Sequence, residues 1–365
     1  MEILESIIQP QSLDRIELLS YLTTIAYMIL LPYLGLLLSS ALLSSIFNSR
    51  GKSYKNIHYI KLAKDIIALP TFNLFASLGL VILPLFVLMF TYAQLVQSSS
   101  QLVFDNLFYL IFLIIPSIFL MYISKGSFAL KDITKLVNKT KESDTDKEVE
   151  FKFYKSWKFK LLAISTPVAF LLLLLASYIL LAGISLISDS SRWETVTSLS
   201  DMLWNEATLI SFLFFLSVSF ALTSVVALYL YFKPESYHDK SDRKYSDLMK
   251  KFFLNTAIIF VIVQPLLYAL DVMSVPSIAL SNSLFIISIG VITLLLIIVS
   301  LLYHMIKENE LKYRGIVLFL FIGLFALLAM KVQVGFDTSS QLQIQKIIKV
   351  YEVQSAEMEE QLGMK

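Results

Sequence analysis

The sequence contains no cysteine and only three histidines, His58, His238 and His304. The missing cysteines exclude disulfides, thiolate catalysis, iron–sulfur clusters, cysteine-ligated zinc sites and the covalent haem attachment motif C-x-x-C-H. We therefore expect no covalently bound cofactor and no metal site. The common phosphate-binding, metalloprotease and hydrolase motifs are also missing, so we expect no self-contained catalytic site.

Charge is scarce as well. Only 16% of the 365 residues are charged and 57% are hydrophobic, whereas a soluble domain carries roughly a quarter charged residues. The net charge of +2 suggests no nucleic-acid partner. We expect the chain to contact the lipid bilayer as an integral membrane protein.

The sequence contains many long apolar runs. Each is near or above the roughly 20 residues that span hydrocarbon as a helix, and none has Asp, Glu, Lys or Arg in its apolar centre. The sequence predicts an all-α fold, a polytopic transmembrane bundle of about eight helices with a C-terminal amphipathic helix outside it. The runs cover about 16–47, 66–97, 103–124, 161–188, 207–232, 252–270, 283–306 and 315–334.

Basic residues alternate between the connecting segments. Segments 48–65, 125–160, 233–251 and 307–314 hold 24 of the 30 Lys and Arg residues. The positive-inside rule places these segments in the cytoplasm. This pattern predicts a multi-pass protein of the bacterial inner membrane, with its N- and C-termini on the periplasmic side.

Few polar residues lie at membrane depth, namely Asn73, Asn255 and Gln264, and we expect them to form interhelical hydrogen bonds. The lack of charge in the helix centres argues against a proton-coupled transporter or pump. His304 is either a haem ligand or proton carrier, or an interfacial side chain with its tip among the headgroups. Residues 54–67 read as an amphipathic surface helix.

Prolines lie within or at the margins of the helices. They either break helices around a transport site or are ordinary kinks satisfied by neighbouring helices. They stand at positions 32, 70, 84, 116, 167 and 265.

The tail differs from the rest of the chain. We expect residues 1–335 to form the transmembrane bundle and 336–365 a periplasmic helix, with Asp337 as its N-cap. Its apolar seam follows heptad-like spacing and is our candidate partner-binding surface. Two interpretations stay open, a helix lying back on the protein's own outer face and a helix that docks a partner. The seam contains Ile344, Ile348, Tyr351, Met358 and Leu362, with Ser355 between them.

Several short segments carry a resemblance. They are Leu31-Pro-Tyr-Leu-Gly-Leu-Leu-Leu-Ser-Ser, Tyr59-Ile-Lys-Leu-Ala-Lys-Asp-Ile-Ile, Ser191-Arg-Trp, Val263-Gln-Pro-Leu and Gln343-Ile-Gln-Lys-Ile-Ile-Lys-Val-Tyr-Glu. Together they resemble the membrane part of bacterial membrane-anchored c-type cytochromes. The first two are also similar to the start of the large subunit of cytochrome bd quinol oxidases, although no haem ligand carries over.

In those membrane-anchored cytochromes the outer helix leads to a haem domain with C-x-x-C-H, which a cysteine-free chain cannot supply. The resemblance implies a membrane anchor or accessory subunit of an electron-transfer complex that docks a separate periplasmic c-type cytochrome through its C-terminal helix. A quinone could bind in a groove of the bundle. The alternatives are a transporter or channel for an uncharged solute, and a purely structural scaffold.

Overall fold

The computed structural model shows an all-α membrane protein, as predicted. Eight helices are long and apolar enough to cross a membrane, and no strand occurs in the part of the chain that the structure describes. They are α2 (Leu13–Ser53), α4 (Leu74–Leu95), α5 (Ser100–Lys139), α7 (Trp157–Ile187), α9 (Glu206–Tyr231), α10 (Arg243–Met273), α11 (Asn282–Glu308) and α12 (Arg314–Ser339). Described are residues 13–95, 100–139, 157–193, 195–196, 198–232, 243–341, 344–345, 348–349 and 352–353.

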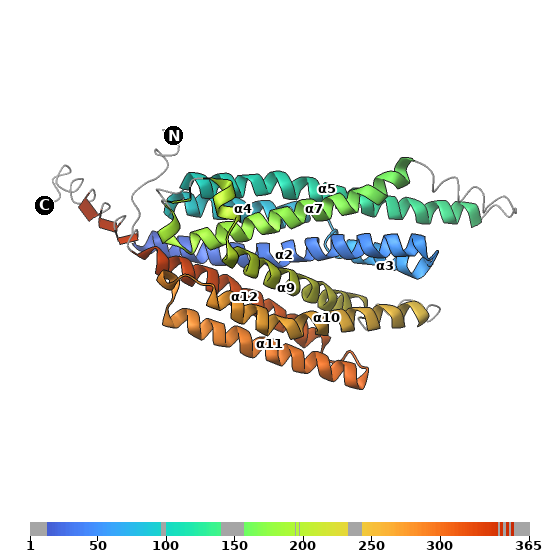
Figure 1. Cartoon of the computed structure of the whole chain (residues 1–365). Coiled ribbons are helices and arrows are strands. Elements are labelled where there is room, and N and C mark those ends of the chain that lie inside the picture. Colours follow the sequence, from blue (N-terminus) through green and yellow to red (C-terminus); the bar gives the residue numbers. More distant parts are fainter. Residues whose placement is uncertain are drawn as a thin grey trace.

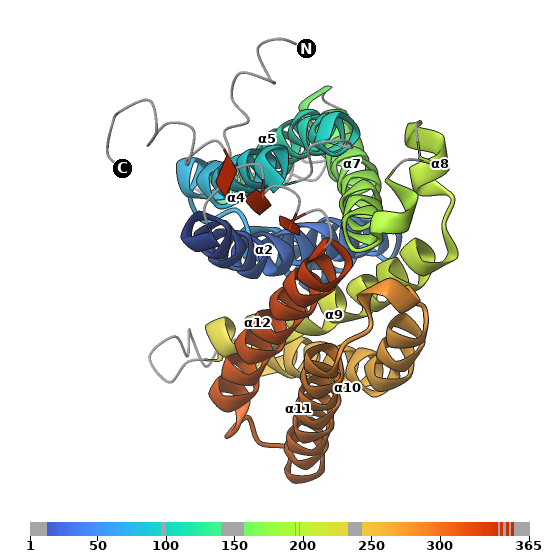
Figure 2. The ribbon, with the colours of Figure 1, turned by 90° about the vertical axis from the view of Figure 1, so that its left-hand side faces the viewer.

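The helices form two groups. Figure 2 shows α2, α4, α5 and α7 on one side and α9 to α12 on the other. Helix α2 contacts α4 and α7 within its own group and α9 and α12 across the junction. Its buried side chains, such as Tyr27, Leu34 and Leu38, lie at the centre of the hydrophobic core.

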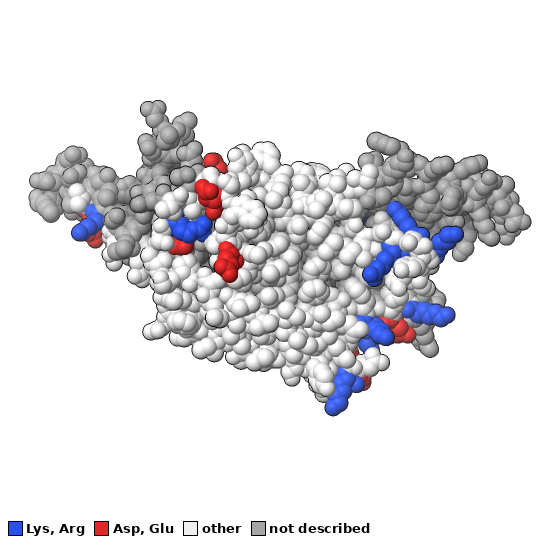
Figure 3. All heavy atoms as spheres, viewed as in Figure 1, with Lys and Arg blue, Asp and Glu red and all other residues white. Residues whose placement is uncertain are grey.

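Charged side chains gather at the two ends of the bundle and leave a broad uncharged band between them (Figure 3). Helix α2 begins and α12 ends at one end, which we call the terminal end (left in Figure 1). The opposite end carries most of the described Lys and Arg side chains, and we call it the basic end. An uncharged band between polar ends is the surface expected of a protein that crosses hydrocarbon.

Small residues bring the two groups into close contact where α2 crosses α9. A Cβ added to Gly35 of α2 would lie 2.7 Å from Oγ of Ser219. One turn along, the hydroxyls of Ser39 and Thr223 are hydrogen-bonded to each other. Small side chains four residues apart let membrane helices approach closely, and hydroxyls then bond across the contact.

The predicted helix over 66–97 is interrupted. It is divided into α3 (Ile57–Ala68) and α4, which begins at Leu74. The freed carbonyl of Pro70 accepts hydrogen bonds from Tyr33 Oη, at 2.9 Å, and from Ser77 Oγ, at 3.1 Å. Asn73, expected to bond between helices, instead accepts from the N–H groups of Phe75 and Ala76 at the start of its own helix.

Helix α3 is amphipathic, as predicted, but its apolar face packs against the protein. Leu62, Ala63, Ile66 and Ile67 are fully buried, and α3 contacts mainly α2. Ser44 Oγ of α2 donates to the carbonyl of Ala63 at 2.8 Å. The apolar stripe is therefore covered by α2, while the opposite face, which includes Lys61, is exposed at the surface.

Candidate functional site

A cavity lies between the two helix groups near the terminal end. Its volume is about 120 Å³, and it is open on one side. Its wall contains residues of α2, α7, α9, α10, α11 and α12, so it exists only because these six helices meet. Pockets of this kind, between the helices of a bundle, are common places for small molecules.

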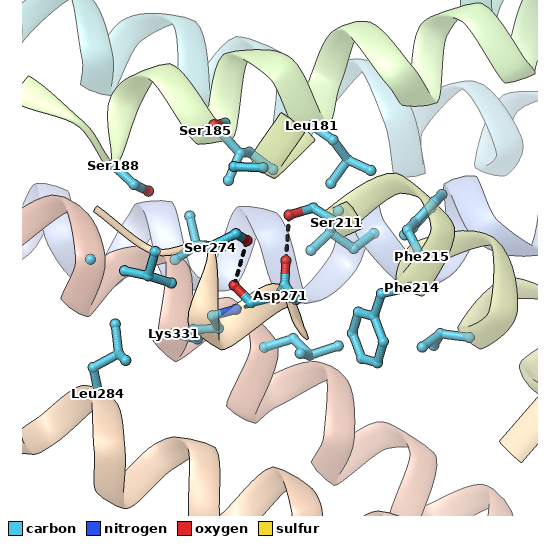
Figure 4. A pocket seen from close by; sticks show the side chains of 18 of the residues that line it. Leu181, Ser185, Ser188, Ser211, Phe214, Phe215, Asp271, Ser274, Leu284 and Lys331 are labelled. Carbon is cyan, nitrogen blue, oxygen red and sulfur yellow. Dashed lines mark hydrogen bonds and ion pairs between the residues drawn. The ribbon is translucent and has the colours of Figure 1, made fainter. Parts of the chain in front are cut away.

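A buried ion pair forms the polar wall of the cavity (Figure 4). Lys331 Nζ of α12 donates to Asp271 Oδ2 of α10, and Ser211 Oγ of α9 donates to Asp271 Oδ1. Only 13% of the Lys331 side chain and 8% of the Asp271 side chain are exposed. The pair is charge-neutral, so it can remain where an isolated charge would be too costly.

Neighbouring groups hold this pair in place. Ser274 Oγ donates to the main-chain carbonyl of Asp271 at 2.9 Å. The ammonium of Lys331 lies 4.9 Å from the centre of the Tyr268 ring, a distance at which a cation is attracted to an aromatic face. Tyr268 in turn donates to Ser288 Oγ of α11 at 3.3 Å. Four helices are thereby joined around one neutral pair.

The cavity is polar toward the terminal end and apolar farther in. Ser185 of α7 and Ser188, the residue after the end of α7, stand on the wall opposite the ion pair (Figure 4). On α9 the lining continues inward from Ser211 through Phe214 to Val218. The cavity thus offers hydrogen-bonding groups at one end and apolar walls at the other.

The sequence did not predict this site. Asp271 directly follows the apolar run over 252–270, and Lys331 lies three residues before the end of its run at 334. Each alone looks like a boundary residue. Opposite charges near the same end of two runs that cross in the same direction were the available signal, but only the packing of α9, α10 and α12 shows that they meet. The sequence led us to expect no charged pair inside the bundle, and the buried Asp271–Lys331 pair near the terminal end corrects this expectation.

The predicted partner-binding residues are only partly covered by the described chain. Ile344 and Ile348 are half-buried and pack against the core, which agrees with a tail that lies back on the bundle over its first turns. Tyr351, Met358 and Leu362 lie outside the described residues. The predicted N-cap is wrong, because Asp337 lies inside α12, where its Oδ1 accepts from Gln333 Nε2 at 2.7 Å.

The histidines do not gather at one place. His304 Nε2 lies 3.0 Å from Glu308 Oε1 on the same helix, with both side chains 44% exposed, and the ring of His58 stacks on Tyr245. His238 is outside the described residues. Among the residues with described positions, no group of three or more His, Asp or Glu side chains could hold a metal ion.

Comparison of the sequence with protein-family models and with curated proteins gives no match.

Proposed function

We propose that this chain is a membrane-embedded accessory subunit of a bacterial electron-transfer complex, and that its cavity binds a quinone. The resemblance to membrane-anchored c-type cytochromes supports the class of complex. The proposal of a bound ligand rests on the cavity. The distribution of Lys and Arg supports an orientation in the inner membrane with the terminal end on the periplasmic side and the basic end in the cytoplasm.

The chemistry of the cavity suits a quinone in three respects. Lys331 has three N–H donors, and Asp271 takes one of them, so others can face a quinone carbonyl. Phe214, Phe215 and Val218 provide apolar walls for the ring and its isoprenoid chain. The neutral Asp271–Lys331 pair favours an uncharged ligand, because an anionic one would compete with Asp271 for Lys331.

Blocking the mouth of the cavity should abolish quinone binding. Ala207 lines the cavity at the first turn of α9, so Ala207→Trp places an indole in the cavity while Asp271 and Lys331 themselves are unchanged. We expect binding of a short-chain naphthoquinone or benzoquinone to weaken by about tenfold or more, a loss of roughly 1.4 kcal/mol. Titration of the purified protein in nanodiscs, followed by equilibrium dialysis, measures this.

Leu209→Trp is the matched control, since Leu209 lies in the same turn of α9, is 50% exposed and is not part of the cavity wall. It should bind quinone as the wild type does. Equal affinity in the wild type and both variants would show that the cavity is not the quinone site. If the wild type shows no measurable binding, the proposal that the cavity binds a quinone is wrong.

The C-terminal tail is the proposed contact for a periplasmic c-type cytochrome. Ile344 and Ile348 face the bundle, while Gln345, Lys349 and Val353 are exposed. The described part of the tail therefore keeps one side available to a partner.

Deleting residues 342–365 should remove the partner and leave the bundle folded. Ser339 and Ser340, which are buried, are kept in this truncation. We expect a cytochrome that co-purifies with the full chain, detected by its haem absorbance, to be lost, while quinone affinity stays unchanged and Tm falls only by the lost packing of Ile344 and Ile348. A cytochrome that remains bound to the truncated chain contradicts docking through the tail.

The cavity also carries a second candidate function, transport of an uncharged solute. It lies at the junction of two helix groups, where relative movement could open it to either side, and α10 contains Pro265 two turns from the ion pair. Solute uptake by liposomes that contain the purified chain alone would favour this function. Absence of flux together with quinone binding would favour the accessory subunit.

A further inference from the structure

Gln264 of α10 is a fully buried amide without a partner. Its side chain is 0% exposed, and neither Nε2 nor Oε1 finds a hydrogen-bond partner among the described residues. The interhelical hydrogen bond expected from the sequence is therefore not formed. Buried amides without partners are rare in native proteins, so a group that satisfies Gln264 has to be sought.

Pro265, the residue after Gln264, deprives a backbone carbonyl in the same turn of its usual helical hydrogen bond. Pro265 has no N–H, so the carbonyl of Val261 has no helical donor four residues ahead. Val261 is fully buried as well. An amide with a donor and an acceptor, next to a carbonyl that lacks its usual helical donor, offers the two to four polar partners that a buried water molecule needs.

This polar turn lies near the middle of the membrane. Gln264 stands nine residues before Met273, the last residue of α10, which is about 14 Å along a helix axis. The hydrocarbon core is about 30 Å thick. Gln264, Tyr268 and Asp271 are spaced by four and three residues, so they share one face of α10.

The cavity reaches the same depth. Along the antiparallel pair α9 and α10, Ser211 bonds to Asp271, the Phe214 ring lies 5.3 Å from that of Tyr268, and Ser217 Oγ donates to the carbonyl of Phe260 at 2.9 Å. Gln264 therefore lies level with the stretch of α9 between Phe214 and Ser217. Phe214 and Phe215 in this stretch, and Val218 just past it, line the cavity, whereas Gln264 lies at the same depth and is not part of the wall.

We propose that Gln264 binds water that is continuous with the cavity, forming a hydrated half-channel from the terminal end to the middle of the membrane. Its polar groups are Asp271 and Lys331, then Tyr268 with Ser288, then Gln264 with the Val261 carbonyl. Water and protons could reach the inner end of the cavity by this route. The inference rests on the cavity and not on the identity of its ligand.

The absence of native cysteine allows a direct test with water itself. A single introduced thiol gives the only S–H stretching band in the infrared spectrum, and transfer to D₂O shifts the band when water reaches the thiol. We expect Gln264→Cys to exchange nearly as fast as Ser211→Cys in the cavity wall. Ala257→Cys is equally buried in α10 but lies two turns nearer the basic end, beyond the proposed inner end of the half-channel, and we expect it to exchange at least tenfold more slowly.

The outcomes separate the two proposals. Slow exchange of Gln264→Cys with fast exchange of Ser211→Cys overturns the half-channel and leaves the cavity intact as a binding site. Slow exchange at both positions shows that the cavity is closed to water, which overturns the half-channel, while quinone binding is decided separately by the Ala207→Trp titration.

A second variant tests hydration with the native surroundings in place. If Gln264 is dry, its replacement by leucine removes an unsatisfied amide and raises Tm. If Gln264 is hydrated, Gln264→Leu displaces bound water, strands the Val261 carbonyl and gives no rise. A clear rise in Tm therefore overturns the proposal, and an unchanged or lower Tm supports it.

Discussion

Replacing Lys331 with methionine is expected to lower the free energy of unfolding by about 3–5 kcal/mol, the usual effect of removing one partner of a buried ion pair. The Asp271 carboxylate, 8% exposed, would keep only the Ser211 hydroxyl as a side-chain donor. A buried charge without a counter-charge is strongly disfavoured in a bundle surrounded by hydrocarbon. Unfolding by SDS titration in bicelles, followed by tryptophan fluorescence, measures the change.

Two further variants identify the cause. Lys312→Met removes an exposed lysine at the basic end and should change stability by no more than about 0.5 kcal/mol. Adding Asp271→Leu to Lys331→Met should recover most of the loss, because removing both charges leaves none uncompensated. A single variant within about 1 kcal/mol of the wild type would show that the pair is hydrated and not buried in the membrane.

Gly35→Leu is expected to separate the two helix groups, with a loss of about 3 kcal/mol, the upper end of the range for overpacking. Even a Cβ at this position would lie 2.7 Å from Ser219 Oγ, so leucine forces α2 and α9 apart. The Ser39–Thr223 hydrogen bond lies one turn away and should break as well. Because Leu31 of α2 and Val218 of α9 line the cavity, quinone affinity should fall together with stability.

Gly79→Leu is the matched control on α4, since no atom lies within 4 Å of a Cβ added there. It should leave stability unchanged or slightly higher, because leucine favours helix more than glycine does. A second pair of variants with a smaller added side chain tests whether steric crowding at Gly35 is the cause. Gly35→Ala should be destabilising alone, and Ser219→Ala should relieve it, since this leaves the Ser219 Cβ at 3.3 Å as the nearest side-chain atom. Destabilisation that persists in the double variant contradicts a steric cause.

Most of the helices could be predicted from hydrophobicity, with two informative exceptions. The run over 66–97 is continuous in hydropathy, yet helix α3 ends at Ala68 and α4 begins only at Leu74. The interruption is stable because Tyr33 and Ser77 donate hydrogen bonds to the Pro70 carbonyl. Helix α12 passes the expected boundary at Gly335 because Gln333 satisfies the Asp337 carboxylate within the helix. In both places hydrogen bonds made by side chains decided where the helix ends. A hydropathy profile does not record such bonds.

The candidate site was much less predictable. Gln264 was recognised as polar at membrane depth, but its lack of a partner depends on which residues of α9 and α11 lie opposite it. Asp271 and Lys331 lie 60 residues apart and were each read as boundary residues. The tail seam was visible from its spacing, and Ile344 and Ile348 do pack against the bundle. The role of the remaining seam stays a prediction.

The amino-acid sequence by itself determined the membrane-protein class of the fold and how many helices are long and apolar enough to cross a bilayer. These features are local, because a helix satisfies its own backbone hydrogen bonds and its apolar length must match the hydrocarbon. Only the tertiary structure decided which helix faces meet and hence where the cavity lies. In lipid the hydrophobic effect does not choose between equally apolar faces, so close steric fit at Gly35 and polar pairing at Asp271 and Lys331 select the contacts.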